Sequence, residues 1–507
     1  MKNFYITTPI YYVNDSPHIG HAYTSLCCDY IARFKKLDGF NVKFLTGTDE
    51  HGQKVENAAN AKQIEPKDFV DEVSKNFLKL TGVLNLSNSD FIRTTEHRHL
   101  NSCEYLWKKL YSEGHIYLDK YSGWYSVRDE AYFQESELIN GKAPTGADVE
   151  WVEEPSYFFN LSNWQEKLLA FYKNNPEFIL PKSRKNEVIS FVKNGLKDLS
   201  VSRKSFSWGI PVPNNKNHVI YVWLDALTNY LSALNYPNKN DDLFKKFWPA
   251  SIHLIGKDIL RFHAVYWPAF LLAAKIDLPK RVYGHGWILS GEEKMSKSKG
   301  NILDPLEIIK EYGLDPLRYY LIKEVSFGND GNISQERLED CINSDLANNY
   351  GNLCQRVTAF AIKNCNGKIP LEVKFHDEDL LILNKYKDNL DNIRLQIDNQ
   401  NINFYIDYIV NSLFEANKYF NDQEPWKKKE DIIRLNTIVY TTLEIVRKIS
   451  FLLYPIIPES SLKALKIFDI EEKNIKLDTV SNNEYLTKGN NINKIDILFK
   501  KIEKNND

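Results

Sequence analysis

The chain has 507 residues, of which 43% are hydrophobic and 26% are charged, a composition typical of a soluble enzyme with several structural units. Its formal net charge of −2 at pH 7 excludes a global basic field, so a nucleic acid must be bound by local Lys and Arg patches. The sequence contains no apolar run of membrane length and no basic leader, so we expect a cytoplasmic protein without a membrane partner.

The first third of the chain alternates strand-like and helical stretches. The strands are predicted at residues 4–8, 41–46 and 91–94, and the helices at residues 17–34, 67–80 and 97–112. Alternation of this kind with glycine-rich strand exits predicts an α/β domain with a doubly wound, Rossmann-like parallel sheet. Ligands of such sheets bind at the carboxyl ends of the strands, where Asp49 is expected.

The start of the first predicted helix has the features of a phosphate site. Ser16 is a typical N-cap and Pro17 a typical first helical residue, and the N–H groups that follow favour an anion. His18 and His21 share one face of the first turn, and Gly20 leaves room for a nucleotide. These features predict an ATP site, although surface or capping histidines explain the pair equally well from this stretch alone.

The pattern changes twice further along the chain. From about residue 115 to 205 it shows short aromatic strands, which predict a β-rich unit inserted into the sheet. The sheet is expected to resume with stretches at 218–227, 252–258 and 281–283, with a helix at 261–269. From about residue 335 helical periodicity dominates, which predicts an all-α helix bundle over 345–480 and a polar tail after it.

Two short motifs far apart in the chain carry a family resemblance. Residues 18–21 and 294–300 match, in order, the HIGH and KMSKS signatures of class I aminoacyl-tRNA synthetases. Each motif is weak alone, but the ordered pair is a strong signal. Further stretches resemble methionyl-tRNA synthetases more narrowly, and this resemblance covers almost the full chain; they are residues 47–52, 222–226, 259–263 and 267–269.

The resemblance implies five parts: a first Rossmann-like half at 1–114, a connective peptide at 115–205, a second half at 206–290, a KMSKS loop and stem-contact region at 291–344, and an α-helical anticodon-binding domain with a tail at 345–507. Many relatives bind zinc through cysteine pairs in the connective peptide. This chain has Ser126, Arg128 and Asp129 there, and none of its six cysteines lies in that region or in a C-x-x-C pair. We therefore expect no zinc and reduced, buried thiols.

The resemblance also implies a methionine pocket rich in aromatic residues. A polarizable thioether packs well against aromatic edges, and a carboxylate pairs with the α-ammonium of the amino acid. Aromatic residues make up 13% of the chain, so each one taken singly is better explained as core. The positions carried over are Ile10, Tyr12, Asp49, Trp223, Ala226, Leu227, Tyr230, Ile259, His263 and Trp267.

For the nucleotide, the resemblance implies that His18 and His21 stabilise the α-phosphate of ATP, while Lys294 and Lys297 hold the β- and γ-phosphates with Mg²⁺. These four are the expected catalytic residues. Lys299 is better explained as a solvated lysine. The full set of expected ATP-binding residues is Tyr11, Asn14, His18, Gly20, His21, Gly256, Asp258, Gly286, Trp287, Ile288, Lys294 and Lys297.

Selection of the tRNA is expected in the helical part. Asn352 and Arg356 are four residues apart on one predicted helical face, and Trp426 follows Pro425 at a helix end. In the family, residues at these three positions read the CAU anticodon, with the Trp stacked on a base. A Pro-Trp pair at a helix end is equally common as a plug of the core. The chain stops before the dimerising extension of some relatives, so a monomer is expected.

These features imply a methionine-tRNA ligase that forms methionyl-adenylate from L-methionine and ATP and then charges initiator and elongator tRNA(Met), without binding DNA. The stretch 115–205 is too short for the editing domain that small aliphatic substrates require. A cysteine-specific synthetase would need zinc ligands near its substrate, and these are missing. A tRNA-binding protein without activity would tolerate damaged signatures, whereas His18, His21, Lys294 and Lys297 are all intact here. Another nucleotidyl transferase could share the two signatures but would not need the helical domain.

Overall fold

The structure, a computed structural model, describes residues 2–13, 17–129, 131–133, 135–290, 293–294 and 304–503. The chain divides into two compact units. The sheet unit comprises residues 3–28 and 42–285, and the helical unit comprises residues 1–2, 29–41 and 286–507. Helix α1 (Ile19–Leu37) runs through this division. Among the helices described, none combines the length and the apolar composition that a membrane crossing requires.

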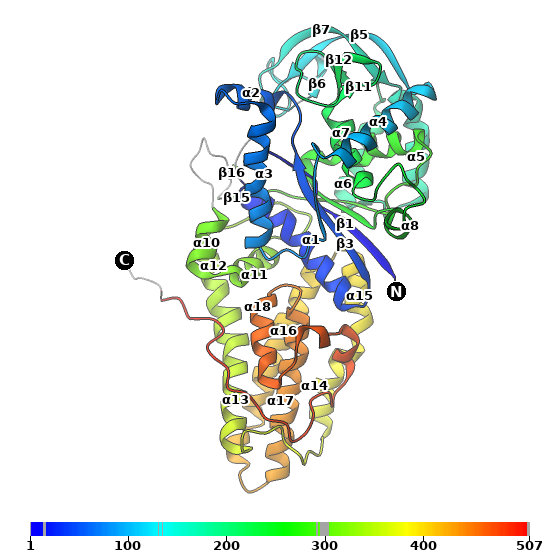
Figure 1. Ribbon diagram of the computed structural model, residues 1–507. Helices are drawn as coiled ribbons and strands as arrows, with labels where there is room; N and C mark the ends of the chain where they lie inside the picture. Colours follow the sequence, from blue (N-terminus) through cyan, green and yellow to red (C-terminus); the bar gives the residue numbers. More distant parts are fainter. Residues whose placement is uncertain are drawn as a thin grey trace. The chain divides into compact units, whose positions relative to one another are not determined.

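A seven-stranded sheet forms the centre of the sheet unit (Figure 1). Its strand order is β2-β3-β1-β13-β14-β8, with β4 beside β3, and the pairs β2–β3, β3–β4, β1–β13, β13–β14 and β14–β8 are parallel. Buried parallel strands with apolar runs confirm the predicted Rossmann-like fold. The strands are β1 (Asn3–Thr7), β2 (Tyr11–Tyr12), β3 (Asn41–Asp49), β4 (Asp90–Arg93), β8 (Ile179–Leu180), β13 (Ile252–Gly256) and β14 (Val282–His285).

The helices of the sheet unit pack their apolar stripes on one large core. Trp107 and Trp267 are fully buried in it, and α4 packs directly against α7. A π turn (Phe262–Tyr266) precedes α9, a feature that is frequent at functional sites. Besides the first half of α1, the helices are α2 (Gln53–Ala61), α3 (Pro66–Val83), α4 (His97–Ser112), α5 (Gln165–Asn174), α6 (Lys182–Lys193), α7 (Val222–Ser232), α8 (Asp242–Phe247) and α9 (Trp267–Ala273).

Two antiparallel sheets are inserted into the sheet unit. In one of them, β5 and β7 pair as a long ribbon (Figure 1). The expected boundaries of the insertion need a correction on both sides. Strand β8 pairs with β14 in the central sheet, with α5 and α6 on either side of it in the chain. The stretch 218–227, expected to resume the central sheet, instead forms the end of the antiparallel strand β12 and the start of α7. A strand of two residues leaves no periodic signal in the sequence. The inserted strands are β5 (Ile116–Ser126), β6 (Ala131–Phe133), β7 (Glu150–Phe159), β9 (Leu199–Ser200), β10 (Ser202–Arg203), β11 (Pro211–Val212) and β12 (Asn215–Ile220).

The helical unit is a bundle in which α13, α14 and α16 pack around the almost fully buried α17 (Figure 1). A small sheet of β15 (Ile288–Ser290), β16 (Glu293–Lys294) and β17 (Gly331–Asn332) precedes it. The helices are α10 (Pro305–Tyr312), α11 (Leu314–Glu324), α12 (Gln335–Cys341), α13 (Asn352–Asn364), α14 (Asp377–Asp388), α15 (Leu390–Asp398), α16 (Ile402–Asp422), α17 (Ile432–Leu453) and α18 (Pro458–Leu465).

Buried polar contacts join the second half of α1 and the C-terminal segment to the rest of the helical unit. Asp29 of α1 accepts from the guanidinium groups of Arg33, at 2.8 Å, and of Arg318 on α11, at 2.6 Å. The second half of α1 therefore belongs to this unit and not to the first Rossmann-like half. The polar tail is packed as well, because Lys448 on α17 donates to Asn483 Oδ1 at 2.9 Å.

Candidate active site

The histidine pair lies at the start of α1, where each ring makes a hydrogen bond with the backbone. The helix begins at Ile19, so His18 takes the N-cap position that was expected for Ser16, which lies outside the described residues. His18 Nδ1 accepts from the Gly20 N–H at 3.1 Å, and His21 Nδ1 accepts from the His18 N–H at 3.2 Å. This reciprocal arrangement is that of a capping box, built here from two imidazoles.

The two backbone hydrogen bonds decide which ring nitrogen carries the proton. A neutral imidazole has one N–H, and since both Nδ1 atoms accept, the proton lies on Nε2 in each ring. Burial, and then the neighbouring His18, lower the pKa of His21 well below its ordinary value, so that ring is neutral at physiological pH. The rings are stacked with centroids 3.8 Å apart. The pair therefore offers neutral Nε2–H donors, which suit phosphate oxygens.

Neighbouring residues hold the pair in place. The Tyr11 ring packs edge-on against His21 with centroids 4.8 Å apart, and its hydroxyl is 2.9 Å from the Ser25 hydroxyl. Tyr11, an expected ATP-binding residue, thus supports His21. A second contact of α1 was not predicted from the sequence: the Thr24 hydroxyl is 2.8 Å from Nε2 of His285 at the end of β14.

Gly256 and Asp258 lie where β13 ends and a short helical turn begins. A Cβ at Gly256 would be 2.6 Å from Asp258 Oδ1, so a larger residue there would displace this carboxylate. Gly256 is the last residue of a central parallel strand and Asp258 follows it, at the edge where nucleotides bind in doubly wound sheets.

The remaining nucleotide residues belong to the helical unit. The Trp287 N–H donates to Asp330 Oδ1 at 2.8 Å, and Ile288 lies opposite Gly331 in the small sheet. A Cβ at Gly286 would be 2.1 Å from the Asn329 backbone, which cannot move aside as a side chain can, so this position requires glycine. Lys294 lies on β16, but its side chain, like Asn14 and Lys297 as a whole, lies outside what the structure describes.

The expected methionine residues on α7 and around α9 form one aromatic cluster in the sheet unit. The Tyr230 hydroxyl donates to His263 Nε2 at 2.7 Å, and His263 Nδ1 donates to the Ile259 carbonyl at 3.0 Å. Burial lowers the pKa of His263 to about 4, so this ring is neutral. The ring of Trp267 lies 6.2 Å from that of Tyr230, and the ring of Trp223 lies 6.2 Å from that of His263.

Two members of this cluster were missed from the sequence. Phe262 stacks on Trp223 with centroids 3.7 Å apart and planes 7° from parallel, and His253 stacks on Tyr230 with centroids 4.1 Å apart. Phe262 belongs to the motif 259–263, so the signal was present. The indole N–H groups of Trp223 and Trp267 are buried and have no hydrogen-bond partner among the residues that the structure describes. Apolar walls with few polar groups are typical of a small-molecule pocket.

The other expected methionine-binding residues also belong to the sheet unit. Asp49 is buried at the carboxyl end of β3, opposite Tyr12 of β2, as the sheet edge predicted. The Tyr12 ring lies 4.7 Å from Lys54 Nζ. Ala226 and Leu227 are buried on α7, and Ile10 and Ile259 are partly buried against the core.

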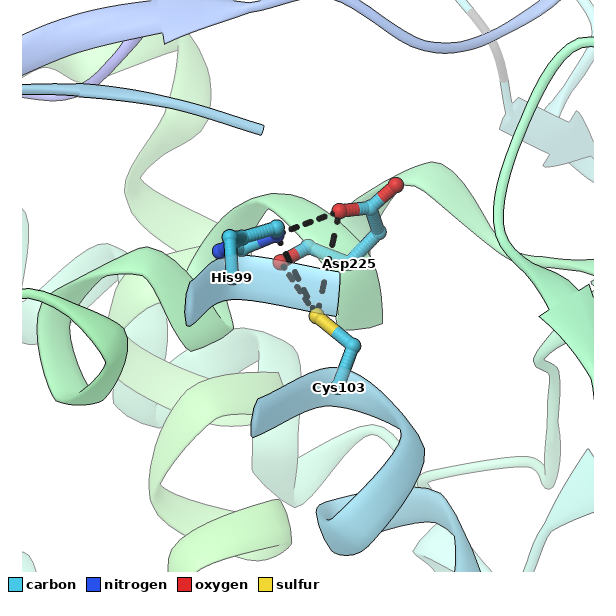
Figure 2. A group of neighbouring side chains, drawn as sticks. All are labelled: His99, Cys103 and Asp225. Carbon is cyan, nitrogen blue, oxygen red and sulfur yellow. Dashed lines mark hydrogen bonds and ion pairs between the residues drawn. The ribbon is translucent and has the colours of Figure 1, made fainter. Parts of the chain in front are cut away.

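A second buried cluster, which the sequence analysis missed, consists of His99, Cys103 and Asp225 (Figure 2). His99 Nε2 is 2.7 Å from Asp225 Oδ1 and 3.2 Å from Cys103 Sγ. These side chains have the chemistry of metal ligands, but two ligands of one tetrahedral zinc ion lie about 3.3–3.5 Å apart. The distance between His99 and Asp225 is that of a charge-assisted hydrogen bond, so the cluster is better explained as a hydrogen-bond network.

The expected anticodon residues lie on α13 and beyond α16 in the helical unit. Arg356 Nη2 donates to Asn421 Oδ1 at 2.7 Å, and its guanidinium lies 5.6 Å from the Phe420 ring. Phe420 in turn contacts Trp426 edge-on with centroids 6.2 Å apart. The Trp426 side chain is 40% exposed, so the alternative of a core plug is wrong. Asn352 is the first residue of α13 and is half-buried, one turn before Arg356.

The parallel sheet, the histidine pair at the first helix and the helical unit define a class I aminoacyl-tRNA synthetase. A family model described as class I tRNA synthetases (M) matches residues 4–149 and 133–358, and one described as the anticodon binding domain of methionyl tRNA ligase matches residues 370–507. The chain belongs to the methionyl-tRNA synthetase family.

Similar proteins support this assignment along the whole chain. The chain is 54% identical to the methionine-tRNA ligase of Rickettsia felis over 99% of both chains, and 49% identical to that of Brucella suis over 92% of both. A solved structure of Mycobacterium tuberculosis methionyl-tRNA synthetase in complex with methionyl-adenylate has 46% identity and a TM-score of 0.95. It matches 98% of this chain and 100% of its own.

Proposed function

We propose that the chain is a methionine-tRNA ligase that activates L-methionine with ATP and transfers it to tRNA(Met), both initiator and elongator. The observation that carries this conclusion is the likeness, over nearly the whole chain, to a synthetase solved with methionyl-adenylate. The five-part division is proposed with three changes. The segment around β8 belongs with the Rossmann-like sheet, the inserted strands extend to β12, and the second half of α1 belongs to the helical unit. The proposed location is the cytoplasm, and the proposed state is a monomer.

The aromatic cluster is the proposed methionine site. The thioether packs against the rings of Trp223, Tyr230 and Trp267, a contact that polarizable sulfur favours. His263 supports this wall as a neutral acceptor for the Tyr230 hydroxyl and brings no charge beside the thioether. Asp49 pairs with the α-ammonium of methionine and thereby orients its carboxylate. The α-ammonium contact serves any amino acid, so the selection of methionine belongs to the aromatic wall.

Activation is a displacement at the α-phosphorus of ATP. A methionine carboxylate oxygen attacks this atom, the bond to the oxygen that bridges to the β-phosphorus breaks, and pyrophosphate leaves with that electron pair. The Nε2–H groups of His18 and His21 donate to the non-bridging α-phosphate oxygens, whose charge is stabilised in the transition state. Lys294 and Lys297 hold the β- and γ-phosphates. Bound Mg²⁺ supplies further charge neutralisation.

Transfer to the tRNA is an acyl transfer without a covalent enzyme intermediate. A hydroxyl of the terminal adenosine of the tRNA loses its proton as its oxygen attacks the carbonyl carbon of methionyl-adenylate. The bond from this carbon to the phosphate oxygen breaks, and AMP leaves with the electron pair. The enzyme contributes chiefly by holding the two reactants in register, which replaces an encounter in solution. No editing step is proposed, because the inserted strands are too short a unit for a second hydrolytic domain.

The inserted strands support a connective peptide without zinc. Where relatives carry cysteine pairs, the Ser126 hydroxyl donates to Asp129 Oδ2 at 3.0 Å, and the Thr145 hydroxyl donates to the same oxygen at 2.5 Å. Arg128 Nη2 also donates to the Thr145 carbonyl at 2.5 Å. Hydroxyl groups and one carboxylate are a poor donor set for zinc, which prefers thiolate and imidazole. Hydrogen bonds thus supply the cross-links that a zinc ion supplies in such a loop.

The decisive test is ATP–pyrophosphate exchange by the purified chain, with each amino acid tried separately in Mg²⁺ and without added zinc. We expect exchange with methionine alone, and we expect a zinc chelator to leave it unchanged. Exchange with another amino acid would mean that the aromatic cluster was assigned wrongly. No exchange with any amino acid would rule out the activation step, and loss of exchange on chelation would contradict the zinc-free loop.

Replacement of Trp426 by Ala is expected to raise the KM for tRNA(Met) by about tenfold to a hundredfold, because stacking of one base on an aromatic ring contributes about 1–3 kcal/mol. Pyrophosphate exchange, which needs no tRNA, should stay unchanged. Phe414→Ala is the matched control, since Phe414 on α16 is an aromatic side chain that is 65% exposed in the same unit. If the two substitutions had equal effects on aminoacylation, the assignment of Trp426 to the anticodon site would be wrong.

A further inference from the structure

Asp225 is a fully buried carboxylate that no part of the proposed chemistry uses. It lies in the first turn of α7, between the methionine-site residues Trp223 and Ala226. Oδ2 is 2.7 Å from His51 Nδ1, and Oδ1 is 2.7 Å from His99 Nε2. Two imidazoles from different elements thus bind the two oxygens of one side chain.

The charge state of this group follows from its partners. Burial by itself raises the pKa of Asp225, but the charges and hydrogen bonds of His51 and His99 outweigh it and lower the pKa to about 2. An ionised carboxylate only accepts hydrogen bonds, so each imidazole presents an N–H to it. Burial, and then the Asp225 charge, raise the pKa of Cys103 well above its ordinary value, so Cys103 stays a thiol in this cluster (Figure 2).

The two hydrogen bonds of Asp225 lead to different parts of the sheet unit. His51 follows the carboxyl end of β3 and is two residues from Asp49, the proposed partner of the methionine ammonium. His99 lies in the first turn of α4, the helix that packs against α7. His99 Nδ1 is also 3.1 Å from the hydroxyl of Ser232, the last residue of α7. His99 therefore contacts both ends of α7, whereas His51 ties the start of α7 to the end of β3.

This connection fixes a distance that methionine binding depends on. Asp49 and Trp223 lie on separate elements, and each is two residues from a member of the pair His51–Asp225. A ligand that is bound at its ammonium and at its side chain needs both anchors at a constant separation. A shift of about 1 Å between binding groups can lower a rate by about a hundredfold.

We propose that Asp225 is a positioning residue for methionine, and that its hydrogen bond to His51 holds the ammonium anchor Asp49 in register with the aromatic wall on α7. The hydrogen bond to His99 fixes α7 from its other side and serves the stability of the sheet unit. This inference rests on the proposed function, since it concerns the proposed methionine site.

The test measures the KM for methionine and the KM for ATP in pyrophosphate exchange, together with the thermal midpoint of each variant. His51→Ala is expected to raise the KM for methionine by about tenfold to a hundredfold, because both anchors are displaced. The KM for ATP should stay within about twofold. His51→Asn places an amide N–H near the position of Nδ1 and should restore most of the methionine affinity.

Two further variants separate positioning from general stability. If His51 acts through Asp225, the double variant His51→Ala with Asp225→Asn should be no worse for methionine than Asp225→Asn alone. Asp379→Asn is the control, since Asp379 is a fully buried carboxylate of the helical unit that is paired with Arg434 at 2.6 Å. It should lower the thermal midpoint without changing either KM.

Each outcome decides the inference. A methionine KM that is unchanged in His51→Ala, or a KM for ATP that rises equally, overturns the positioning role while wild-type exchange leaves the proposed function intact. The same conclusion follows if His51→Asn fails to restore affinity. If Asp225→Asn does not fold, the comparison of His51→Ala with His51→Asn still decides. A wild-type chain without methionine-dependent exchange overturns the proposed function itself.

Discussion

His18→Asn is expected to lower the kcat of methionine-dependent pyrophosphate exchange by about a hundredfold to a thousandfold, the effect of removing one donor from a transition-state oxyanion. The structure makes this substitution specific. His18 caps α1 through Nδ1 and offers the opposite nitrogen, Nε2–H, to the α-phosphate. Asparagine is among the best N-cap residues and places its oxygen close to the position of Nδ1. The helix start should therefore survive while the phosphate donor is lost.

The complementary variant His18→Gln keeps an N–H near the position of Nε2 but does not place an acceptor at Nδ1. We expect a kcat above that of His18→Asn, with a lower thermal midpoint because the cap is weakened. His18→Ala should combine both losses. The measurements are kcat in pyrophosphate exchange and the thermal midpoint of each variant. If the rate follows the thermal midpoint through the three variants, His18 is only a cap and the phosphate role is wrong.

Asp49→Asn is expected to lower kcat/KM for methionine by about a hundredfold or more, since a charge-assisted contact in a buried site contributes about 2–5 kcal/mol. The amide has the shape of the carboxylate but carries no charge to pair with the ammonium. Asp49 is only 2% exposed, so water does not screen this loss strongly. The measurements are KM and kcat for methionine, with the KM for ATP determined in parallel.

An analogue of methionine without its amino group provides the control for Asp49. Such a carboxylic acid keeps the thioether and the carboxylate, so it should inhibit the wild type and Asp49→Asn with about equal affinity. A loss of affinity for the analogue as large as the loss for methionine would mean that the substitution damages the whole pocket. Asp49 would then have a structural role and no direct part in binding the ammonium.

Elements with a regular apolar period were predicted well from the sequence. The helix at 97–112 coincides with α4, and Asp49 lies at the carboxyl end of β3 as expected, although the strand predicted at 41–46 extends to Asp49. Very short elements were not predicted. The strand β8 has two residues, and it joins the central sheet only because β14 supplies its hydrogen-bond partners. This is why the segment around β8 was assigned to the inserted unit.

The capping residue of α1 was misplaced for a related reason. Ser16 and Pro17 have strong local preferences for a helix start, yet the helix begins at Ile19. The imidazoles of His18 and His21 satisfy the free backbone N–H groups there, a role for which histidine has little statistical preference. A local rule failed at the one turn where side chains are also proposed to bind phosphate, and functional sites are where such failures are expected.

The sequence by itself determined the family, the order of the parts and the residue types of the site, because signature motifs and periodic patterns are local properties of the chain. Only the tertiary structure decided which side chains hold one another. Tyr230 and His263 are 33 positions apart, His99 and Asp225 are 126 apart, and His51 and Asp225 are 174 apart. Their hydrogen bonds form because the parallel sheet brings strand ends and helix starts to one edge. The separation of these residues along the chain does not predict that they are close in space.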